Sequence, residues 1–238
     1  MAGPDDAEHH HLAHEVADEL ARDLDHEVSD LTDPRTRRRV ALRHVVDGGL
    51  PFLVFFAGYQ WRSVAAGAVA AVVVTGAIAG LRLVQGAPLR AVGVGAVAVT
   101  VSAVTAAATG EGRAFFAPGV LFNLVGLVVT LTTLLAGRPA TGVVAHRLGR
   151  EDRDWRRRAD RRRLHRRLTW FWAGLWAWHL AVLIPLYLAG SVGALAVVTT
   201  FILKPSLLVW LVATVVWAER SGSSQPGGGP PGGRLAPG

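Results

Sequence analysis

Residues 115–136 read FFAPGVLFNLVGLVVTLTTLLA and contain no charged side chain. This stretch decides the fold, because an α-helix rises about 1.5 Å per residue and needs about 20 apolar residues to cross the roughly 30 Å hydrocarbon core of a bilayer. An apolar run of this length is typical of a transmembrane helix. The sequence therefore indicates an integral membrane protein.

Five further apolar stretches flank this one along the chain. Turns with polar, Gly or Pro residues separate them, and most are long enough to cross the bilayer. We therefore expect an all-α, polytopic helical membrane protein with six transmembrane helices. The six predicted spans cover residues 41–59, 63–81, 91–108, 115–136, 168–189 and 195–218.

The composition excludes several classes of protein. Only 18% of the 238 residues are charged, whereas charged residues make up about a quarter of a typical soluble domain. The chain has no cysteine, which excludes a disulfide scaffold, a thiol nucleophile and a cysteine-type zinc site. It also lacks a nucleotide-binding loop, a nucleophile elbow and a metalloprotease motif. We therefore expect no enzyme activity, no metal site and no cofactor.

Charge is concentrated in blocks between the apolar stretches. Residues 1–33 carry eleven acidic side chains and one Arg, residues 34–44 carry five Arg, and residues 138–167 carry twelve Arg and four acidic side chains. Lys and Arg are enriched in cytoplasmic loops, so their placement indicates orientation. With six spans and both termini cytoplasmic, the outer turns hold only Arg62 and Arg113. We therefore expect a multi-pass protein of the inner membrane in that orientation.

Two segments flank the predicted membrane domain of residues 41–220. Residues 1–40 are polar and acidic, and an apolar side chain recurs every four residues from Leu12 to Val28, which predicts an amphipathic or disordered cytoplasmic segment. They lack the features of a signal peptide, so the first apolar helix is expected to be the insertion signal. Residues 221–238 are mostly Ser, Gly and Pro, a composition that predicts a disordered tail.

Four polar side chains inside the predicted spans are the candidate site residues: Asp47, Asn123, His179 and Lys204. Charge inside hydrocarbon is costly, so such residues often serve function. Lys204 is the only Lys among 25 basic residues, and a desolvated ammonium can lose its proton, whereas a guanidinium cannot. The four side chains together could make a proton relay or a small anion site.

Each of these residues also has a structural interpretation. Asp47 is the expected partner of Lys204, or else it caps a first helix that begins late. Lys204 can extend its ammonium to the surface, and a lone intramembrane His or Asn is more often a helix–helix hydrogen bond worth about 1 kcal/mol. Pro51 and Pro205 are expected to kink their helices, because proline lacks a backbone N–H.

The connection over residues 138–167 holds the densest positive charge. The cytoplasmic leaflet is anionic, and each basic residue near it contributes roughly 1 kcal/mol of attraction, so lipid headgroups are candidate ligands. A role in fixing topology explains the same charge, and the acidic residues 1–33 could dock there. Nucleic-acid binding is not expected, because the charge adjoins membrane spans. The headgroup candidates are Arg156, Arg157, Arg158, Arg161, Arg162, Arg163, Arg166 and Arg167.

Several short motifs in the membrane part resemble a known family. They are Asp47-Gly48-Gly49-Leu50-Pro51-Phe52, Phe116-Ala117-Pro118-Gly119 with Asn123, Gly137-Arg138-Pro139, Leu168-Thr169-Trp170, Leu186-Tyr187 and Lys204-Pro205. Over about residues 42–220 the sequence resembles an actinobacterial family of integral membrane proteins catalogued as a domain of unknown function. It is more distantly similar to bacterial intracellular septation protein A. The resemblance implies a membrane protein linked to the cell envelope.

Two functions follow as predictions. The first is a non-enzymatic envelope-maintenance or septation-related scaffold, whose partners are the lipid bilayer and either other membrane proteins or further copies of the chain. The second is a small secondary transporter or channel that uses the intramembrane Lys, Asp and His side chains.

Overall fold

The computed structural model describes residues 37–87, 89–149, 151–152 and 154–222, and every regular element in these ranges is a helix. The all-α prediction is confirmed for this part of the chain. Residues 1–36 of the predicted acidic segment and nearly all of the predicted tail lie outside the described residues. The elements are α2 (Arg37–Trp61), α3 (Val64–Val84), α4 (Leu89–Thr109), η1 (Gly112–Phe116), α5 (Ala117–Leu135), α6 (Ala140–Arg147), α7 (Ala159–Leu188), α8 (Val192–Val198), η2 (Thr199–Leu203) and α9 (Lys204–Gly222).

Five helical stretches in the described residues are long and apolar enough to cross a membrane, as expected of a multi-pass membrane protein. They correspond to the second to sixth predicted spans. The first predicted span corresponds to α2, whose N-terminal part is rich in Arg and which contains Asp47. A crossing by α2, and with it the total of six, stays a prediction. The five stretches are Val64–Val84, Val92–Thr109, Gly112–Leu135, Ala159–Leu188 and Val192–Ala218.

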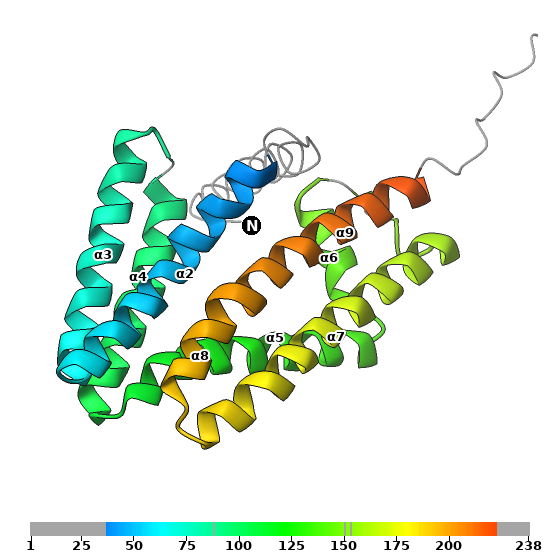
Figure 1. Ribbon diagram of the computed structural model, residues 1–238. Coiled ribbons are helices and arrows are strands. Elements are labelled where there is room, and N and C mark those ends of the chain that lie inside the picture. The colour runs from blue at the N-terminus through cyan, green and yellow to red at the C-terminus, as the bar shows by residue number, and fades with distance from the viewer. Residues whose placement is uncertain (1–36, 88, 150, 153, 223–238) are drawn as a thin grey trace, which may run out of the picture.

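The helices form two groups joined by a long helical rod (Figure 1). In the first group α2 packs on α3 and α3 packs on α4, while in the second group α7 packs on α5 and α6. The rod consists of α8, η2 and α9, which follow one another without a break and include a π-helical segment at η2. It contacts both α2 and α7 and so connects the groups.

Aromatic side chains form the core where α2 meets η1. Phe55 and Phe115 are fully buried, and their rings stack with centroids 3.9 Å apart. Phe116 packs edge-on against Phe55 with a centroid distance of 6.2 Å. Aromatic pairs contribute about 0.5–1.5 kcal/mol beyond the area that they bury. This cluster fixes the start of the fourth predicted span against the first.

Indole hydrogen bonds join α7 to α9 within the apolar region. Trp172 Nε1 donates to Thr214 Oγ1 at 3.0 Å, and Trp210 Nε1 donates to the carbonyl of Phe171 at 3.0 Å. The Phe171 and Trp210 rings also stack, with centroids 4.5 Å apart. Because a buried indole N–H needs an acceptor, these pairs restrict how the two helices can rotate.

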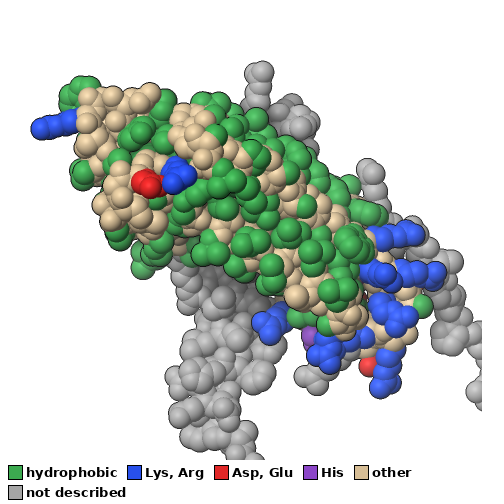
Figure 2. All heavy atoms as spheres, turned by 90° about the horizontal axis from the view of Figure 1, so that it is seen from below, with side chains coloured by type: hydrophobic (Ala, Val, Ile, Leu, Met, Phe, Trp, Pro, Cys, Tyr) green, Lys and Arg blue, Asp and Glu red, His purple; other side chains and the backbone are tan. Residues whose placement is uncertain are grey.

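The surface is apolar over most of its length and charged at one end. Figure 2 shows a mainly hydrophobic face with most of its Lys and Arg side chains gathered at one end, as expected of a protein surrounded by lipid. Away from that end, Arg113 Nε donates to Glu111 Oε2 at 2.7 Å. This hydrogen bond, together with the guanidinium charge, lowers the pKa of the Glu111 carboxyl. Arg113 is therefore paired on the side predicted to face outward.

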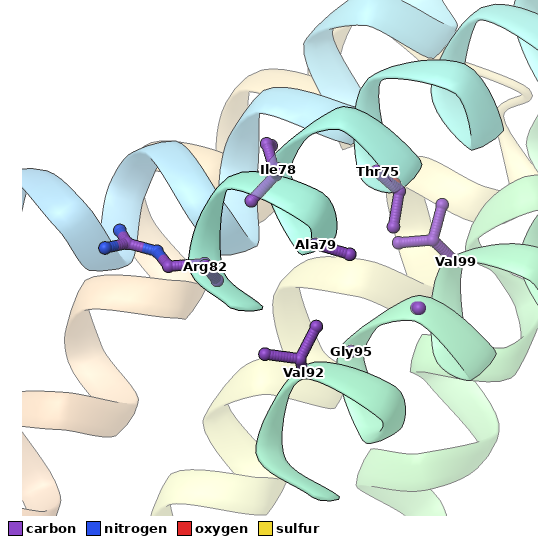
Figure 3. A pocket seen from close by; sticks show the side chains of 8 residues that line it. Thr75, Ile78, Ala79, Arg82, Val92, Gly95 and Val99 are labelled. Atoms are coloured by element: carbon purple, nitrogen blue, oxygen red, sulfur yellow. The ribbon is translucent and has the colours of Figure 1, made fainter. Parts of the chain in front are cut away.

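A hollow of about 110 Å³ lies between α3 and α4 (Figure 3). Its wall is mostly apolar, and Figure 3 shows the Arg82 side chain directed away from the others. The Thr75 hydroxyl donates to its own helix at the Ala71 carbonyl. None of the candidate site residues lines the hollow. Its lining residues are Thr75, Ile78, Ala79, Arg82, Val92, Gly95, Ala96 and Val99.

Candidate functional site

Two of the four intramembrane candidates meet in a buried cluster. His179 on α7 is 1% exposed, and Asn123 on α5 is also buried. His179 Nδ1 lies 2.8 Å from Asn123 Oδ1, and His179 Nε2 lies 2.8 Å from Ser206 Oγ on α9. We call these three residues the His179 cluster. It joins three helices that are far apart in sequence by direct hydrogen bonds.

Sequence reasoning did not identify Ser206 as a member of this cluster. A single Ser in an apolar helix commonly donates to its own backbone, and Ser206 Oγ does lie 2.8 Å from the Leu203 carbonyl. The available signal was its position two residues after Lys204, in the same helix. That signal gives depth along the helix but does not give the side of the helix.

Lys204 contacts α2 rather than the His179 cluster. Its Cδ lies 3.6 Å from the point where a Cβ on Gly48 would stand, and its Nζ lies 5.6 Å from the centroid of the Phe52 ring. The residue is exposed at the surface of the helix group. An ammonium over an aromatic face gains a cation–π attraction. The three candidates whose side chains the structure describes therefore divide between two places.

The structure leaves the Lys204–Asp47 pair open. Lys204 lies against Gly48, the residue directly after Asp47 on α2. The Asp47 side chain lies outside the described part of the chain. The ion pair between them stays a prediction, as does the alternative that Asp47 caps the helix.

The two candidate prolines lie in segments that pack against each other. Pro51 is buried within α2, and Pro205 lies two residues after the end of the π-helical η2. Thr200 on η2 donates to the Gly49 carbonyl at 3.1 Å, and a Cβ on Gly49 would collide with the Thr200 side chain. Proline cannot donate the backbone bond that an α-helix needs, so a change of helical pattern before Pro205 has a local cause.

The Arg-rich connection is a folded unit in the described residues, not simply a polar loop. It contains the helix α6, and Trp155 beyond α6 is 1% exposed. The Trp155 ring fills the space beside Gly142, where a Cβ would collide with it. It also packs edge-on against His165 at the start of α7, with centroids 5.1 Å apart. We call residues 138–167 the Arg-rich unit.

Polar contacts join α6 and the residues that follow it to the start of α7. Glu151 Oε1 lies 3.0 Å from His165 Nε2, and the backbone carbonyl of Glu151 lies 2.9 Å from His146 Nδ1. Thr141 Oγ1 donates to the His165 carbonyl at 2.9 Å and lies 2.9 Å from Thr169 Oγ1. The side chains of Glu151 and His165 are almost fully buried. Sequence reasoning did not predict α6, this polar network or the burial of Trp155.

Four of the eight Arg headgroup candidates contact a carboxylate or an aromatic ring, and a fifth, Arg163, donates from Nε to the Ala159 carbonyl at 3.2 Å. Three form ion pairs with carboxylates, and the guanidinium of Arg156 lies 5.5 Å from the Trp155 ring centroid. Such partners partly neutralise the charge or hold it in place. The ion pairs are Arg157 with Asp154 (3.8 Å), Arg158 with Asp152 (3.5 Å) and Arg161 with Glu151 (3.6 Å).

The other four candidates are exposed on the first turns of α7, and no carboxylate among the described residues pairs with them. With 3.6 residues per turn, they fall on one side of the helix. Trp170, which is 54% exposed, falls on the same side one turn further along. We call this surface the four-Arg face; it consists of Arg162, Arg163, Arg166 and Arg167.

No curated protein and no solved structure matches this chain. A family profile does match, over residues 41–225. The matched range includes the His179 cluster, Lys204 and the whole Arg-rich unit, and it confirms the predicted membership of a family of unknown function. The chain belongs to the family described as protein of unknown function (DUF3159).

Proposed function

We propose that this protein is a non-enzymatic scaffold of the cell envelope, in line with the predicted envelope-maintenance or septation-related role. In this proposal it crosses the inner membrane six times with both termini in the cytoplasm. The four-Arg face binds the phosphate groups of anionic lipids in the cytoplasmic leaflet. The observation that carries the proposal is that this face lies on a folded unit, at the start of the stretch Ala159–Leu188 that is long and apolar enough to cross a membrane.

The spacing along α7 supports contact with headgroups. Trp residues are enriched at the membrane–water interface, and Trp170 is exposed. Arg163 lies seven residues before Trp170, which is about 10 Å along an α-helix. Arg167 lies between them on the same side of the helix. The guanidinium groups therefore reach the depth at which lipid phosphates lie when Trp170 sits at the interface.

Because the Arg-rich unit is folded, its Arg side chains form a lipid-binding surface with a fixed shape rather than a flexible basic loop. A flexible basic loop would lose conformational entropy on binding. Here the packing of Trp155 and the Glu151–His165 contact hold the start of α7 in place before any lipid binds. Guanidinium groups on such a helix are positioned for bidentate phosphate contacts.

Replacing all four side chains of the four-Arg face with Gln is expected to weaken anionic lipid binding. Each Arg near an anionic surface contributes roughly 1 kcal/mol. The measurement is the thermal stability of detergent-solubilised protein as phosphatidylglycerol or phosphatidylcholine is added. We expect the wild type to gain more stability from phosphatidylglycerol, and the fourfold variant to lose most of that difference.

The matched control replaces Arg157 and Arg158, which already pair with carboxylates, with Gln. This control is expected to keep most of the response to phosphatidylglycerol. A wild-type protein that responds equally to the two lipids would contradict the lipid-binding proposal. So would a fourfold variant with an unchanged response.

A secondary transporter or channel is the second candidate, because the His179 cluster places a buried ionisable ring at a junction of three helices. Complementing a deletion strain with Lys204→Met separates the two candidates. The scaffold predicts long or misdivided cells that both wild type and variant rescue, because Lys204 is exposed. A solute- or pH-specific growth defect that only wild type rescues would favour transport instead.

A further inference from the structure

We propose that His179 is an intramembrane proton-binding site and that the Ser206 hydroxyl turns between two acceptors as the proton binds and leaves. The inference goes beyond the scaffold proposal and does not depend on it. If the protein is a secondary transporter, the second candidate function, the proton bound at His179 would be its coupling ion. It follows from counting hydrogen-bond donors and acceptors in the His179 cluster.

One half of the cluster is fixed. Asn123 Nδ2 donates to the Gly119 carbonyl at 2.7 Å, because a carbonyl can only accept. The other end of the amide, Oδ1, must then accept, and it faces His179 Nδ1 at 2.8 Å. His179 therefore carries a proton on Nδ1 in both of its charge states. Turning the amide over would set two acceptors against each other at Gly119.

The other half of the cluster has two consistent arrangements. Ser206 has one hydroxyl proton and lies 2.8 Å from both His179 Nε2 and the Leu203 carbonyl. When His179 is neutral, Nε2 is an acceptor and the hydroxyl donates to it. When His179 is charged, Nε2–H donates to Ser206 Oγ, and the hydroxyl proton turns to the Leu203 carbonyl. In each arrangement, every N–H and O–H proton of the His179 and Ser206 side chains is donated in a hydrogen bond.

The reaction in this proposal is proton transfer alone. A hydronium ion gives its proton to the Nε2 lone pair, which leaves a water molecule and an imidazolium, while the hydroxyl hydrogen bond to Nε2 is replaced by one in the opposite direction. No other covalent bond forms or breaks. Two indole rings also adjoin the imidazole, Trp178 at 5.3 Å and Trp176 at 6.2 Å between centroids.

Few other ionisable groups lie on the helices around His179. The sequence of α5 holds none, and in α7 only the phenol of Tyr187 occurs between Leu168 and Leu188 apart from His179 itself. The rod of α8, η2 and α9 holds Lys204 as its only ionisable residue before Glu219. The Lys204 side chain lies against α2 at Gly48. His179 is thus the titratable group with direct hydrogen bonds to both neighbouring helices.

The Leu203 carbonyl, which accepts the Ser206 hydroxyl when His179 is charged, connects the site to the π-helical part of the rod. Leu203 is the last residue of the π-helical η2, and Thr200 in the same segment bonds to Gly49 on α2. Protonation of His179 therefore changes the hydrogen bonding of a carbonyl in the segment that holds α2. This places the proton site next to the junction between the two helix groups.

The test is ¹⁵N NMR of histidine-labelled full-length protein in lipid bilayers, with His179 assigned by difference from His179→Gln. At about pH 8 we expect the neutral form with the proton on Nδ1. As the pH falls to about 4, both ring nitrogens should become protonated while the protein stays folded. A ring that keeps one neutral form over this range would overturn the proposal, and so would a neutral ring that carries its proton on Nε2.

Ser206→Ala tests the hydroxyl. It removes the acceptor for the charged form and the donor for the neutral form, and a charge-assisted hydrogen bond is about twice as strong as a neutral one. The pH at which half of the His179 rings are protonated should therefore fall by about one unit. Ser102→Ala, which removes a buried hydroxyl on α4, is the matched control and should leave the midpoint unchanged. Equal midpoints in Ser206→Ala and wild type would contradict the role of the hydroxyl.

Discussion

Trp155→Ala is expected to unfold the Arg-rich unit while the membrane helices stay folded. Replacing a fully buried Trp with Ala typically costs about 3–5 kcal/mol, because buried contacts are lost and a cavity remains. Trp155 is 1% exposed and fills the space between Gly142 and His165. The helix α6 has only eight residues, and helices shorter than about 12 residues are marginal without tertiary packing. The remaining support of α6 is polar: Thr141 bonds to His165 and Thr169 on α7, and His146 bonds to Glu151.

Amide hydrogen exchange measures this effect directly. A loss of about 3 kcal/mol raises the population of the open unit, and hence the exchange of the α6 amides, by roughly a hundredfold. Trp170→Ala is the matched control, because Trp170 is 54% exposed on the neighbouring helix. It should leave exchange in α6 unchanged. If Trp155→Ala also left α6 as protected as in wild type, Trp155 would not be the core of this unit.

Gly67→Leu is expected to separate α2 from α3 and to cost about 3 kcal/mol or more, because overpacking a tight contact is strongly destabilising. A Cβ at Gly67 would stand 2.5 Å from the Phe55 carbonyl oxygen and 3.0 Å from the Tyr59 amide nitrogen. These are backbone atoms of α2, so no side chain can move away to make room. Most of the variant protein should fail to purify as a folded species.

Gly76→Leu on the same helix provides the control. Nothing lies within 4 Å of the point where its Cβ would stand, and the residue is exposed. Leu also has a higher helix propensity than Gly, so this variant should be at least as stable as wild type. Thermal unfolding followed by size-exclusion chromatography in detergent compares the two. Similar stability of the two variants would show that α2 and α3 do not pack as closely as described.

The helices could be predicted from the sequence because a lipid environment imposes a simple rule on length and polarity. Each of the six predicted spans corresponds to a helical stretch in the described residues. Backbone groups in hydrocarbon must bond within their own helix, so uncharged runs such as 115–136 have few alternatives. The ends of the helices were less certain, because capping depends on single residues such as Ser63, which accepts from the Ala66 amide.

The arrangement of the candidate site could not be predicted in the same way. The position of His179 or Asn123 along a helix gives its depth, but apolar residues occur on all sides of these helices, so no apolar stripe indicates which side faces a neighbour. Ser206 therefore went unrecognised. The fold of the Arg-rich unit could not be predicted for a different reason. Its core depends on one large apolar side chain, Trp155, within a run of Arg.

The central claim is that the chain crosses the membrane six times with the Arg-rich unit in the cytoplasm. The chain has no cysteine, so single Cys substitutions at exposed positions in intact cells report sidedness to a membrane-impermeant maleimide. The account predicts that Gln60→Cys and Ala189→Cys react from outside, and that Gln85→Cys and Asp154→Cys react only after permeabilisation. The account would be contradicted if Gln60→Cys and Gln85→Cys reacted from the same side of the membrane, or if Asp154→Cys reacted from outside.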